Sequence, residues 1–305
     1  MLTYLTLALG FTGLFLGGDW LVKGASGIAL RFGVAPMIIG LTIVGFGTSM
    51  PELLVSLTAA FGGQPGIAIG NVVGSNIANI LLILGIAAVI APIAVAFANI
   101  RRDLFWMTGA VLVLPLLFWS GTVGLIEGLL MVAALIVYLV ISLRGANQSP
   151  DDLPAGNSFV QSGIFVLLGL GAVVLGAHFL VQSATVIARD FGVSEAMIGL
   201  SIVAIGTSLP ELATTVMAVI RGQRDIAVGN VIGSNIFNVL GILGITALLT
   251  PIPLAPRFLI IDTPLLIAIT LGVVALIWAT GKIGRLAGVA MLAGYAVYIV
   301  GTASL

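Results

Sequence analysis

Apolar segments of roughly bilayer-spanning length follow one another along the whole chain. They are interrupted at charged residues, prolines and glycines, and these breaks predict about ten helices. The pattern is typical of an all-α polytopic membrane protein rather than of a soluble domain with an apolar core. The expected helices span residues 3–30, 35–61, 67–90, 102–119, 124–143, 160–188, 195–220, 226–249, 259–279 and 286–303.

The two halves of the chain resemble each other. A shift of 159 residues carries Glu52 onto Glu211 without a gap, and carries Gly70-Asn71 onto Gly229-Asn230. Each half holds five expected helices, an odd number, so the second half must enter the membrane in the opposite orientation. We therefore predict two inverted five-helix repeats, residues 1–143 and 159–305, joined by a polar cytoplasmic linker, residues 144–158.

The composition agrees with this architecture. The 305 residues are 60% hydrophobic and only 7% charged, whereas a soluble domain carries about 25% charged residues. The net charge of zero gives no reason to expect a nucleic-acid partner, and the lipid bilayer is the expected surrounding. An enzyme is disfavoured, and no cofactor is expected, because the chain has no cysteine, a single histidine (His178) and no Gly-x-Ser-x-Gly elbow.

The basic residues predict the orientation, because cytoplasmic loops carry an excess of Lys and Arg. If both termini lie outside, the outer loops hold only Arg189 and Arg257. The chain is then expected to be a multi-pass protein of the cell (inner) membrane. The basic residues of the cytoplasmic loops are Arg31, Arg101, Arg102, Arg144, Arg221, Arg224, Lys282 and Arg285.

Two acidic residues lie in the middle of apolar segments, each within the same motif: Gly-Thr-Ser-x-Pro-Glu ends at Glu52 and again at Glu211. A carboxylate near the centre of a bilayer costs roughly 2.5–3.5 kcal/mol on insertion scales. Two such residues at equivalent positions are difficult to explain by packing. They indicate the two halves of one cation site, with hydroxyl ligands from Thr48, Ser49, Thr207 and Ser208.

The prolines of this motif, Pro51 and Pro210, are expected to break their helices in mid-membrane. Such a break would free backbone carbonyls near Gly45 and Ala204 as further oxygen ligands. Ser49-x-x-Glu52 also fits a capping box, and the second copy does the same. Capping alone does not explain why the acid is Glu rather than Gln.

A second duplicated motif, Gly-Asn-Val-x-Gly-Ser-Asn-Ile-x-Asn, places polar residues four apart on one helix face. Its Gly-x-x-x-Gly pairs serve close helix packing, but packing does not require the amides. We predict that Ser75, Asn79, Ser234 and Asn238 are ligands. For Asn71, Asn76, Asn230 and Asn235, ligation and the tying together of helices both stay open.

All of these candidates offer hard oxygen atoms, which suit Ca²⁺ and Na⁺ rather than zinc or copper. Two glutamates balance the charge of one Ca²⁺. Release of that ion would leave two carboxylates repelling each other unless Na⁺ or protons replaced it. Exchange therefore follows from the charge count, with Ca²⁺ and Na⁺ as transported substrates.

The two motifs resemble the signature repeats of the sodium/calcium exchanger family, within the cation/calcium antiporter superfamily. The resemblance covers essentially the whole chain and is closest to the prokaryotic type. It implies an ion-binding core of helices two, three, seven and eight, with helices one and six sliding against it. It also implies ligand roles for the twelve positions Thr48, Ser49, Glu52, Ser75, Asn79, Thr207, Ser208, Glu211, Ser234, Asn238, Gly45 and Ala204.

One departure from the family pattern bears on the coupling ion, and two alternative functions stay open. Several relatives, the potassium-dependent exchangers among them, carry aspartate where this chain has Asn238, which disfavours potassium coupling. The proton-coupled branch has Gly-Asn-x-x-Glu in place of Gly-Thr-Ser-x-Pro-Glu, which favours sodium here. An H⁺/Ca²⁺ or other divalent cation antiporter is the alternative transporter. A cation channel is the alternative from another class, although channels usually draw their symmetry from several subunits.

Overall fold

A computed structural model describes residues 2–144, 158–192 and 204–303. This part of the chain is almost entirely helical, with four strands of two residues each. Seven of its helices are long and apolar enough to cross a membrane, and a bent helix pair makes an eighth. A polytopic all-α membrane protein is confirmed, while the count of ten helices stays a prediction.

The first half begins with the long helix α1 (Leu2–Phe32) and ends with α9 (Leu125–Arg144). Between them lie a broken helix, a continuous helix with a π-helical turn, and a helix with a short extension. The elements are α2 (Pro36–Ile39), η1 (Gly40–Val44), α3 (Gly45–Thr48), α4 (Met50–Phe61), α5 (Pro65–Ala78), η2 (Asn79–Ile83), α6 (Leu84–Ile90), β1 (Ile93–Ala94), α7 (Phe97–Leu112), α8 (Leu114–Leu117) and β2 (Thr122–Val123).

The second half begins with the similarly long α10 (Phe159–Asp190), where the N-cap residue Ser158 and Gln161 of the first turn form a reciprocal capping box. Its further elements follow the order of the first half. They are α12 (Ala204–Gly206), α13 (Leu209–Ile220), α14 (Arg224–Ile236), η5 (Phe237–Leu243), α15 (Gly244–Leu249), β3 (Ile252–Pro253), η6 (Phe258–Asp262), α16 (Thr263–Thr280), β4 (Lys282–Ile283) and α17 (Arg285–Ala303).

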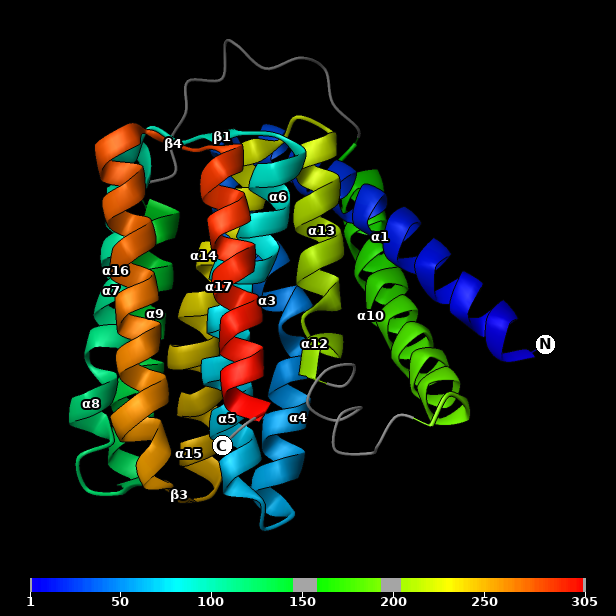
Figure 1. The fold of residues 1–305 in the computed structure, drawn as a ribbon. Coiled ribbons are helices and arrows are strands. Elements are labelled where there is room, and N and C mark those ends of the chain that lie inside the picture. Colours follow the sequence, from blue (N-terminus) through cyan, green and yellow to red (C-terminus); the bar gives the residue numbers. More distant parts are fainter. Residues whose placement is uncertain (1, 145–157, 193–203, 304–305) are drawn as a thin grey trace.

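Two continuous helices form the centre of the molecule: residues 65–90, which join α5, η2 and α6, and residues 224–249, which join α14, η5 and α15. They are the most buried of the seven candidate spans. Helices α7, α9, α16 and α17 pack around them (Figure 1). The antiparallel ribbons β1–β4 and β2–β3 link the two halves at opposite ends of the bundle. The candidate site lies on these central helices.

Helices α1 and α10 pack against each other beside this bundle and are tilted away from it in Figure 1. The packing is antiparallel, because Gly10 approaches Leu180 whereas Gly24 approaches Val166. Glycines line the contact on both sides. A Cβ atom at Gly17 would lie 2.7 Å from the backbone nitrogen of Val173, so the two backbones touch directly.

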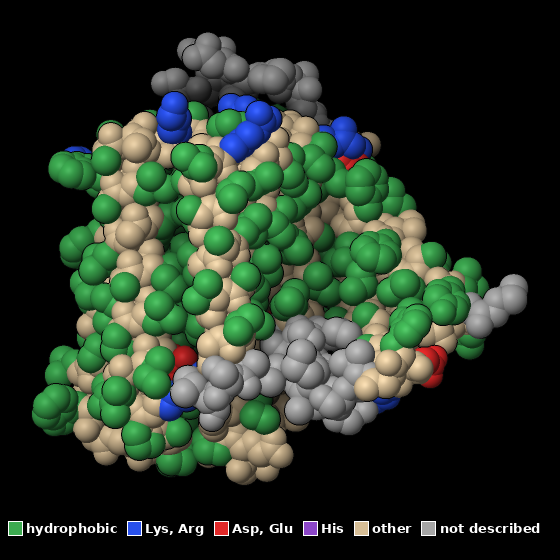
Figure 2. Space-filling view, in the orientation of Figure 1, with side chains coloured by type: hydrophobic (Ala, Val, Ile, Leu, Met, Phe, Trp, Pro, Cys, Tyr) green, Lys and Arg blue, Asp and Glu red, His purple; other side chains and the backbone are tan. Residues whose placement is uncertain are grey.

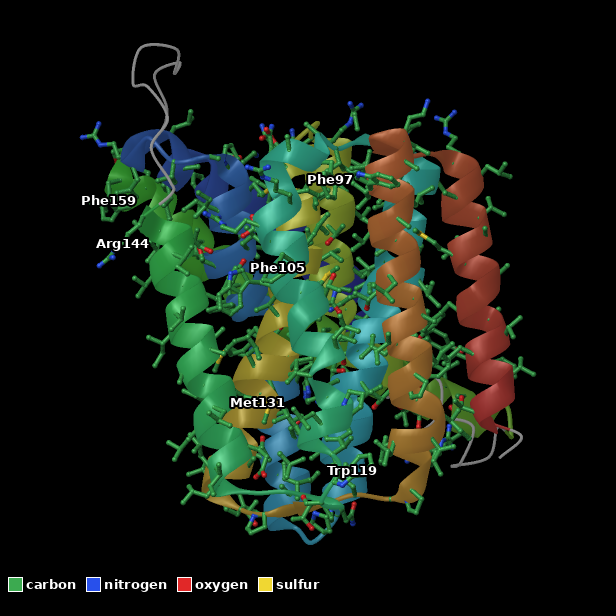
Figure 3. All side chains as sticks on the ribbon, turned by 90° about the vertical axis from the view of Figure 1, so that its left-hand side faces the viewer. Phe97, Phe105, Trp119, Met131, Arg144 and Phe159 are labelled. Carbon is green, nitrogen blue, oxygen red and sulfur yellow. The ribbon has the colours of Figure 1, made fainter. Side chains whose placement is uncertain are left out.

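The surface separates into an apolar belt and charged ends. Figure 2 shows hydrophobic side chains over the sides of the molecule and Lys and Arg gathered over its upper end. Arg144 lies at that end and Trp119, which is 83% exposed, at the opposite one (Figure 3). In Figure 1 the labelled N- and C-termini lie toward the end opposite the basic residues. This distribution fits a chain that spans a bilayer.

Two expected helix boundaries need correction. The fourth helix begins at Phe97 rather than residue 102, and it ends at Leu112, before the short α8 that contains Pro115. Asp103 therefore lies inside the helix, where it is 2% exposed and paired with Arg102, rather than at a helix start. The first part of the expected helix 195–220, and most of the linker 144–158, lie outside the described residues.

We predict that Gly169→Val disrupts the α1–α10 contact. A Cβ at position 169 would overlap the backbone nitrogen of Leu21, and such overpacking typically costs about 1–3 kcal/mol. The midpoint of thermal unfolding in detergent should fall. Gly171→Val is the matched control, because a Cβ there meets nothing within 4 Å. Equal midpoints for the two variants would contradict the direct backbone contact.

Candidate ion-binding site

The first Thr-Ser-x-Pro-Glu copy breaks its helix as predicted. The segment from Pro36 to Thr48 and the helix α4 meet at an angle of 41°. Pro51 lies in the first turn of α4, where its missing N–H leaves the Gly47 carbonyl without the usual donor four residues ahead. Ser49 occupies the N-cap position, but its side chain makes no capping hydrogen bond. The capping box is therefore wrong for this copy.

Instead, the Ser49 hydroxyl donates a hydrogen bond of 2.7 Å to the Glu211 carboxylate of the other half. The second copy has the same local shape: α12 ends at Gly206, a turn follows, and Pro210 and Glu211 lie in the first turn of α13. Ser208 also makes no side-chain cap. The duplicated motifs thus meet in space, and the hydroxyl of the first copy donates a hydrogen bond to the acid of the second.

The two acids are enclosed in the bundle. Glu52 and Glu211 are each 1% exposed, and none of the ion pairs within the described residues involves either of them. One oxygen of each carboxylate is buried without a hydrogen-bond partner there, Oε2 in both cases. A buried carboxylate oxygen needs a donor or a cation. Each acid therefore keeps one oxygen that a cation could bind.

The second duplicated motif supplies amide and hydroxyl groups at the same depth. Asn79 begins the π-helical segment η2, and Asn238 lies within η5. A π-helical turn adds one residue to the helix, and such turns are frequent at functional sites. The side-chain oxygens Oδ1 of Asn79 and Asn238 are buried and have no hydrogen-bond partner among the described residues. Helix α4 packs against η5, and α13 packs against η2.

The remaining predicted ligands lie around this centre. Thr48, Ser75, Ser208 and Ser234 are buried, whereas Thr207 is half-buried in the turn before α13. The Ser234 hydroxyl donates to the Gly45 carbonyl at 3.2 Å. That carbonyl also accepts the Ser49 N–H at 3.2 Å and the Thr48 hydroxyl at 3.3 Å, because α3 closes its last turn before the break. Its role as a ligand stays a prediction. Ala204 begins α12, and its side chain lies outside the described part.

Two of the open asparagines tie helices together. The Asn71 amide group donates to the Glu52 backbone carbonyl and to the Ser56 hydroxyl, both at 2.9 Å. Asn230 makes the equivalent bonds to the Glu211 carbonyl at 3.2 Å and to the Thr215 hydroxyl at 2.9 Å. These contacts hold each acidic helix against its asparagine helix. The tie is confirmed for this pair of residues.

Asp19 makes a contact between helices that are distant in the sequence. It pairs with Lys23 of its own helix at 2.7 Å, and Arg221 at the end of α13 also pairs with Asp19. The cluster therefore fastens α1 to the helix that carries Glu211. Arg221 is far from Asp19 in sequence, and no local spacing connects the two.

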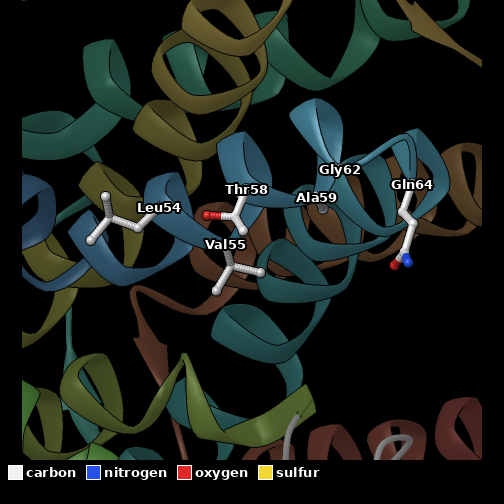
Figure 4. Close-up of a pocket in the computed structure, with 6 residues that line it drawn as sticks. All are labelled: Leu54, Val55, Thr58, Ala59, Gly62 and Gln64. Carbon is white, nitrogen blue, oxygen red and sulfur yellow. The ribbon is translucent and has the colours of Figure 1, made fainter.

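A groove of about 500 Å³ lies on the outer part of α4 and is separate from this centre. Its lining residues are drawn in Figure 4 and are mostly apolar. None of the predicted ligands is among them. The ligands also form no cluster of three or more His, Cys, Asp or Glu in the described part of the chain. The site is instead a pair of carboxylates surrounded by neutral oxygen ligands. The groove is lined by Leu54, Val55, Thr58, Ala59, Gly62 and Gln64.

Comparison with known proteins agrees with this geometry. The family model described as sodium/calcium exchanger protein matches residues 2–144 and 162–303. The chain belongs to the sodium/calcium exchanger family. The resemblance inferred from the two motifs is thereby confirmed, and the protein is a cation/calcium antiporter of the membrane rather than a member of an enzyme family.

Two curated relatives match nearly the whole chain. The sodium/calcium exchanger MaX1 of Methanosarcina acetivorans is 35% identical over 97% of this chain and 97% of its own length. The inner membrane protein YrbG of Escherichia coli K12 is 36% identical over 97% and 96%. A solved structure of the sodium-calcium exchanger NCX_Mj, soaked with 2.5 mM Na⁺ and 0.1 mM Ca²⁺, matches with a TM-score of 0.87, 34% identity and 98% coverage of each chain.

We predict that Asn230→Leu destabilises the fold by about 1–3 kcal/mol, because it leaves the buried Glu211 carbonyl and Thr215 hydroxyl unpaired. Asn71→Leu removes the equivalent bonds but should cost less, since Asn71 is half-buried and water can replace its amide. Urea- or heat-induced unfolding in detergent measures both variants. A larger loss for the Asn71 variant would contradict the assigned role of burial.

Proposed function

We propose that this protein exchanges Na⁺ for Ca²⁺ across the cytoplasmic membrane. The observation that carries the proposal is the pair of buried acids, Glu52 and Glu211, each with one carboxylate oxygen that has no donor among the described residues. Oxygen ligands of this kind suit Ca²⁺ and Na⁺. The relative MaX1 is named a sodium/calcium exchanger, and several structures of NCX_Mj were obtained with Na⁺ together with Ca²⁺ or Sr²⁺.

The charge of the site supports exchange rather than one-way transport. The twelve proposed ligand positions include two carboxylates and no base, so one Ca²⁺ or two Na⁺ neutralises the site. An empty site would hold two acids in a bundle that excludes water, which is unfavourable by several kcal/mol per ion. The site therefore crosses the membrane loaded, and each Ca²⁺ that leaves on one side is replaced by Na⁺.

Alternating access is supported by the way equivalent parts of the two halves meet. Helices α1 and α10 are equivalent under the shift of about 159 residues, and they pack antiparallel. The close approach of Gly85 to Gly288 recurs between Gly244 and Gly128, with the halves exchanged. These contacts are those expected of two inverted five-helix repeats, ten helices in all. We propose that α1 and α10 slide as a pair against the bundle and open the site to one side at a time.

The distribution of the basic residues suggests the orientation of the chain in the membrane. The basic residues gather at one end of the molecule, and the labelled termini lie toward the other (Figures 1 and 2). By the positive-inside rule the basic end is cytoplasmic. We propose that both termini lie outside the cell membrane and that the linker of residues 144–158 lies inside.

The transport function predicts that Glu52→Gln and Glu211→Gln abolish ⁴⁵Ca²⁺ uptake into proteoliposomes loaded with Na⁺ and diluted into Na⁺-free buffer. Each change keeps the size of the side chain and removes one of the two charges that balance Ca²⁺. Uptake should fall to that of empty vesicles, while yield and thermal midpoint stay near wild type.

Glu127→Gln is the matched control, because Glu127 accepts a hydrogen bond from the Gly124 N–H at 2.9 Å at the start of α9, outside the site. It should transport normally. Vesicles loaded with choline, and vesicles with only a pH gradient, identify the coupling ion. Uptake driven by the pH gradient alone would replace the sodium proposal by H⁺/Ca²⁺ exchange, and full activity of either site variant would overturn the site.

The orientation predicts the reactivity of single cysteines, which the cysteine-free chain allows. Gln64 is exposed in the loop between α4 and α5, and Asn99 is exposed near the start of α7 at the opposite end. Gln64→Cys should react with a membrane-impermeant maleimide in intact spheroplasts, and Asn99→Cys only after permeabilisation. The reverse pattern would invert the proposed topology.

A further inference from the structure

One asparagine outside the twelve predicted ligand positions joins the two halves at the site. Asn76 of α5 is fully buried, with 0% exposure. Its Nδ2 donates to the backbone carbonyl of Asn235 at 3.3 Å, and its Oδ1 accepts a hydrogen bond of 3.0 Å from Nδ2 of Asn238. A single side chain of the first half therefore contacts two residues of the second half, one of which is a predicted ligand.

The Asn235 backbone carbonyl determines which atoms of these side chains donate and which accept. A backbone carbonyl can only accept, so the Asn76 atom that faces Asn235 must be the amide nitrogen. The Asn76 oxygen then faces Asn238, which must donate a hydrogen bond to it through its own amide nitrogen. The carbonyl oxygen Oδ1 of Asn238 is left free, and it is buried without a hydrogen-bond partner in the described residues. Rotation of this amide by 180° would break the bond to Asn76.

The equivalent residue of the second half behaves differently. Asn235 corresponds to Asn76 under the shift of 159 residues, yet its Nδ2 donates to the Val231 carbonyl of its own helix at 2.8 Å. The Oδ1 of Asn235 has no hydrogen-bond partner within the part of the chain that the structure describes. Asn79 is therefore not held by Asn235 in the way that Asn238 is held by Asn76. The two amide ligands of the site differ in how firmly they are oriented.

We propose that Asn76 is a positioning residue that holds the side-chain oxygen of Asn238 toward the transported cation. The inference rests on the proposed function, since it takes Asn238 as a ligand. An unrestrained asparagine amide presents its NH₂ group to the site as readily as its oxygen, and an NH₂ group repels a cation. By excluding that rotamer, Asn76 preorganises the second half of the site and raises its affinity for a divalent cation.

The same contact specifies an amide at position 238. A carboxylate there would place an oxygen against the Asn76 oxygen, two acceptors facing each other without a proton between them. If the Asn76 amide rotated to donate its NH₂ group to that carboxylate, the Asn76 oxygen would lie against the Asn235 carbonyl. Asn76 and Asn238 therefore belong together, and they keep the formal charge of the ligand set at that of Glu52 and Glu211 alone.

Calcium binding to the purified full chain in detergent tests this role, by isothermal titration of Asn76→Ala, Asn235→Ala, Asn238→Ala and the double variant Asn76→Ala/Asn238→Ala. We expect Asn76→Ala to raise the Kd for Ca²⁺ by about tenfold, and Asn235→Ala by less than twofold. Because Asn76 acts through Asn238, Asn76→Ala should add nothing in the Asn238→Ala background. A merely structural role would lower affinity equally in both backgrounds.

Equal Kd values for the Asn76 and Asn235 variants, or multiplicative effects in the double variant, would overturn the proposal. If Asn76→Ala is not recovered as a folded protein, Asn76→Ser serves in its place, because its hydroxyl is too short to reach both partners. Sodium-driven uptake is measured on the wild type in parallel. Wild-type binding without exchange would refute the proposed function while the Kd ratios still decide the role of Asn76, and absence of Ca²⁺ binding would refute both.

Discussion

The free-energy cost of holding two carboxylates inside an apolar bundle is the constraint on which the rest of the molecule depends. Glu52 and Glu211 are almost fully enclosed, and neither has a basic partner among the described residues. Water cannot compensate their charge at this depth, so a bound cation or a proton must do so. The broken helices, the hydroxyl that reaches across from Ser49 and the unpartnered amide oxygens all serve that requirement.

The asparagines of the second motif have two different roles. Asn71 and Asn230 use their amide nitrogens to fasten each acidic helix to its neighbour. Asn79 and Asn238 keep a carbonyl oxygen free toward the centre. An amide suits both tasks because it carries a donor and an acceptor at opposite sides of one small planar group. A carboxylate could ligate but not tie, and a methyl group could do neither.

The contact between α1 and α10 has a different character from the centre. It includes several glycines at which the two helix backbones touch. This direct contact holds α1 and α10 together, as the proposed movement of the pair against the bundle requires. The ion pair of Asp19 with Arg221 fastens α1 to α13 at the basic end. The equivalent positions at the other end are His178 and Gly62, which cannot form such a pair.

The family, the membrane-spanning character and most helix positions could be predicted from the sequence, because apolar periodicity and duplicated motifs are local patterns. The break at Pro51 was also local, since proline removes its own N–H wherever it stands. Helix ends were less certain: α7 begins five residues earlier than expected, at Phe97, because Arg101 and Arg102 interrupt the apolar pattern although they lie inside the helix.

The spacing of residues along the sequence could not predict which residues of the two halves contact each other. The sequence indicated a capping role or a ligand role for Ser49, and only the tertiary structure brought its hydroxyl to Glu211, 162 residues away. The sequence also could not predict that Asn76 and Asn235 have different hydrogen-bond partners, since both occupy the same position of the same motif. Sequence determines which groups each repeat offers, whereas the packing of one repeat against the other decides which partner each group meets. That packing is set by the whole interface, so two identical motifs acquire different hydrogen bonds.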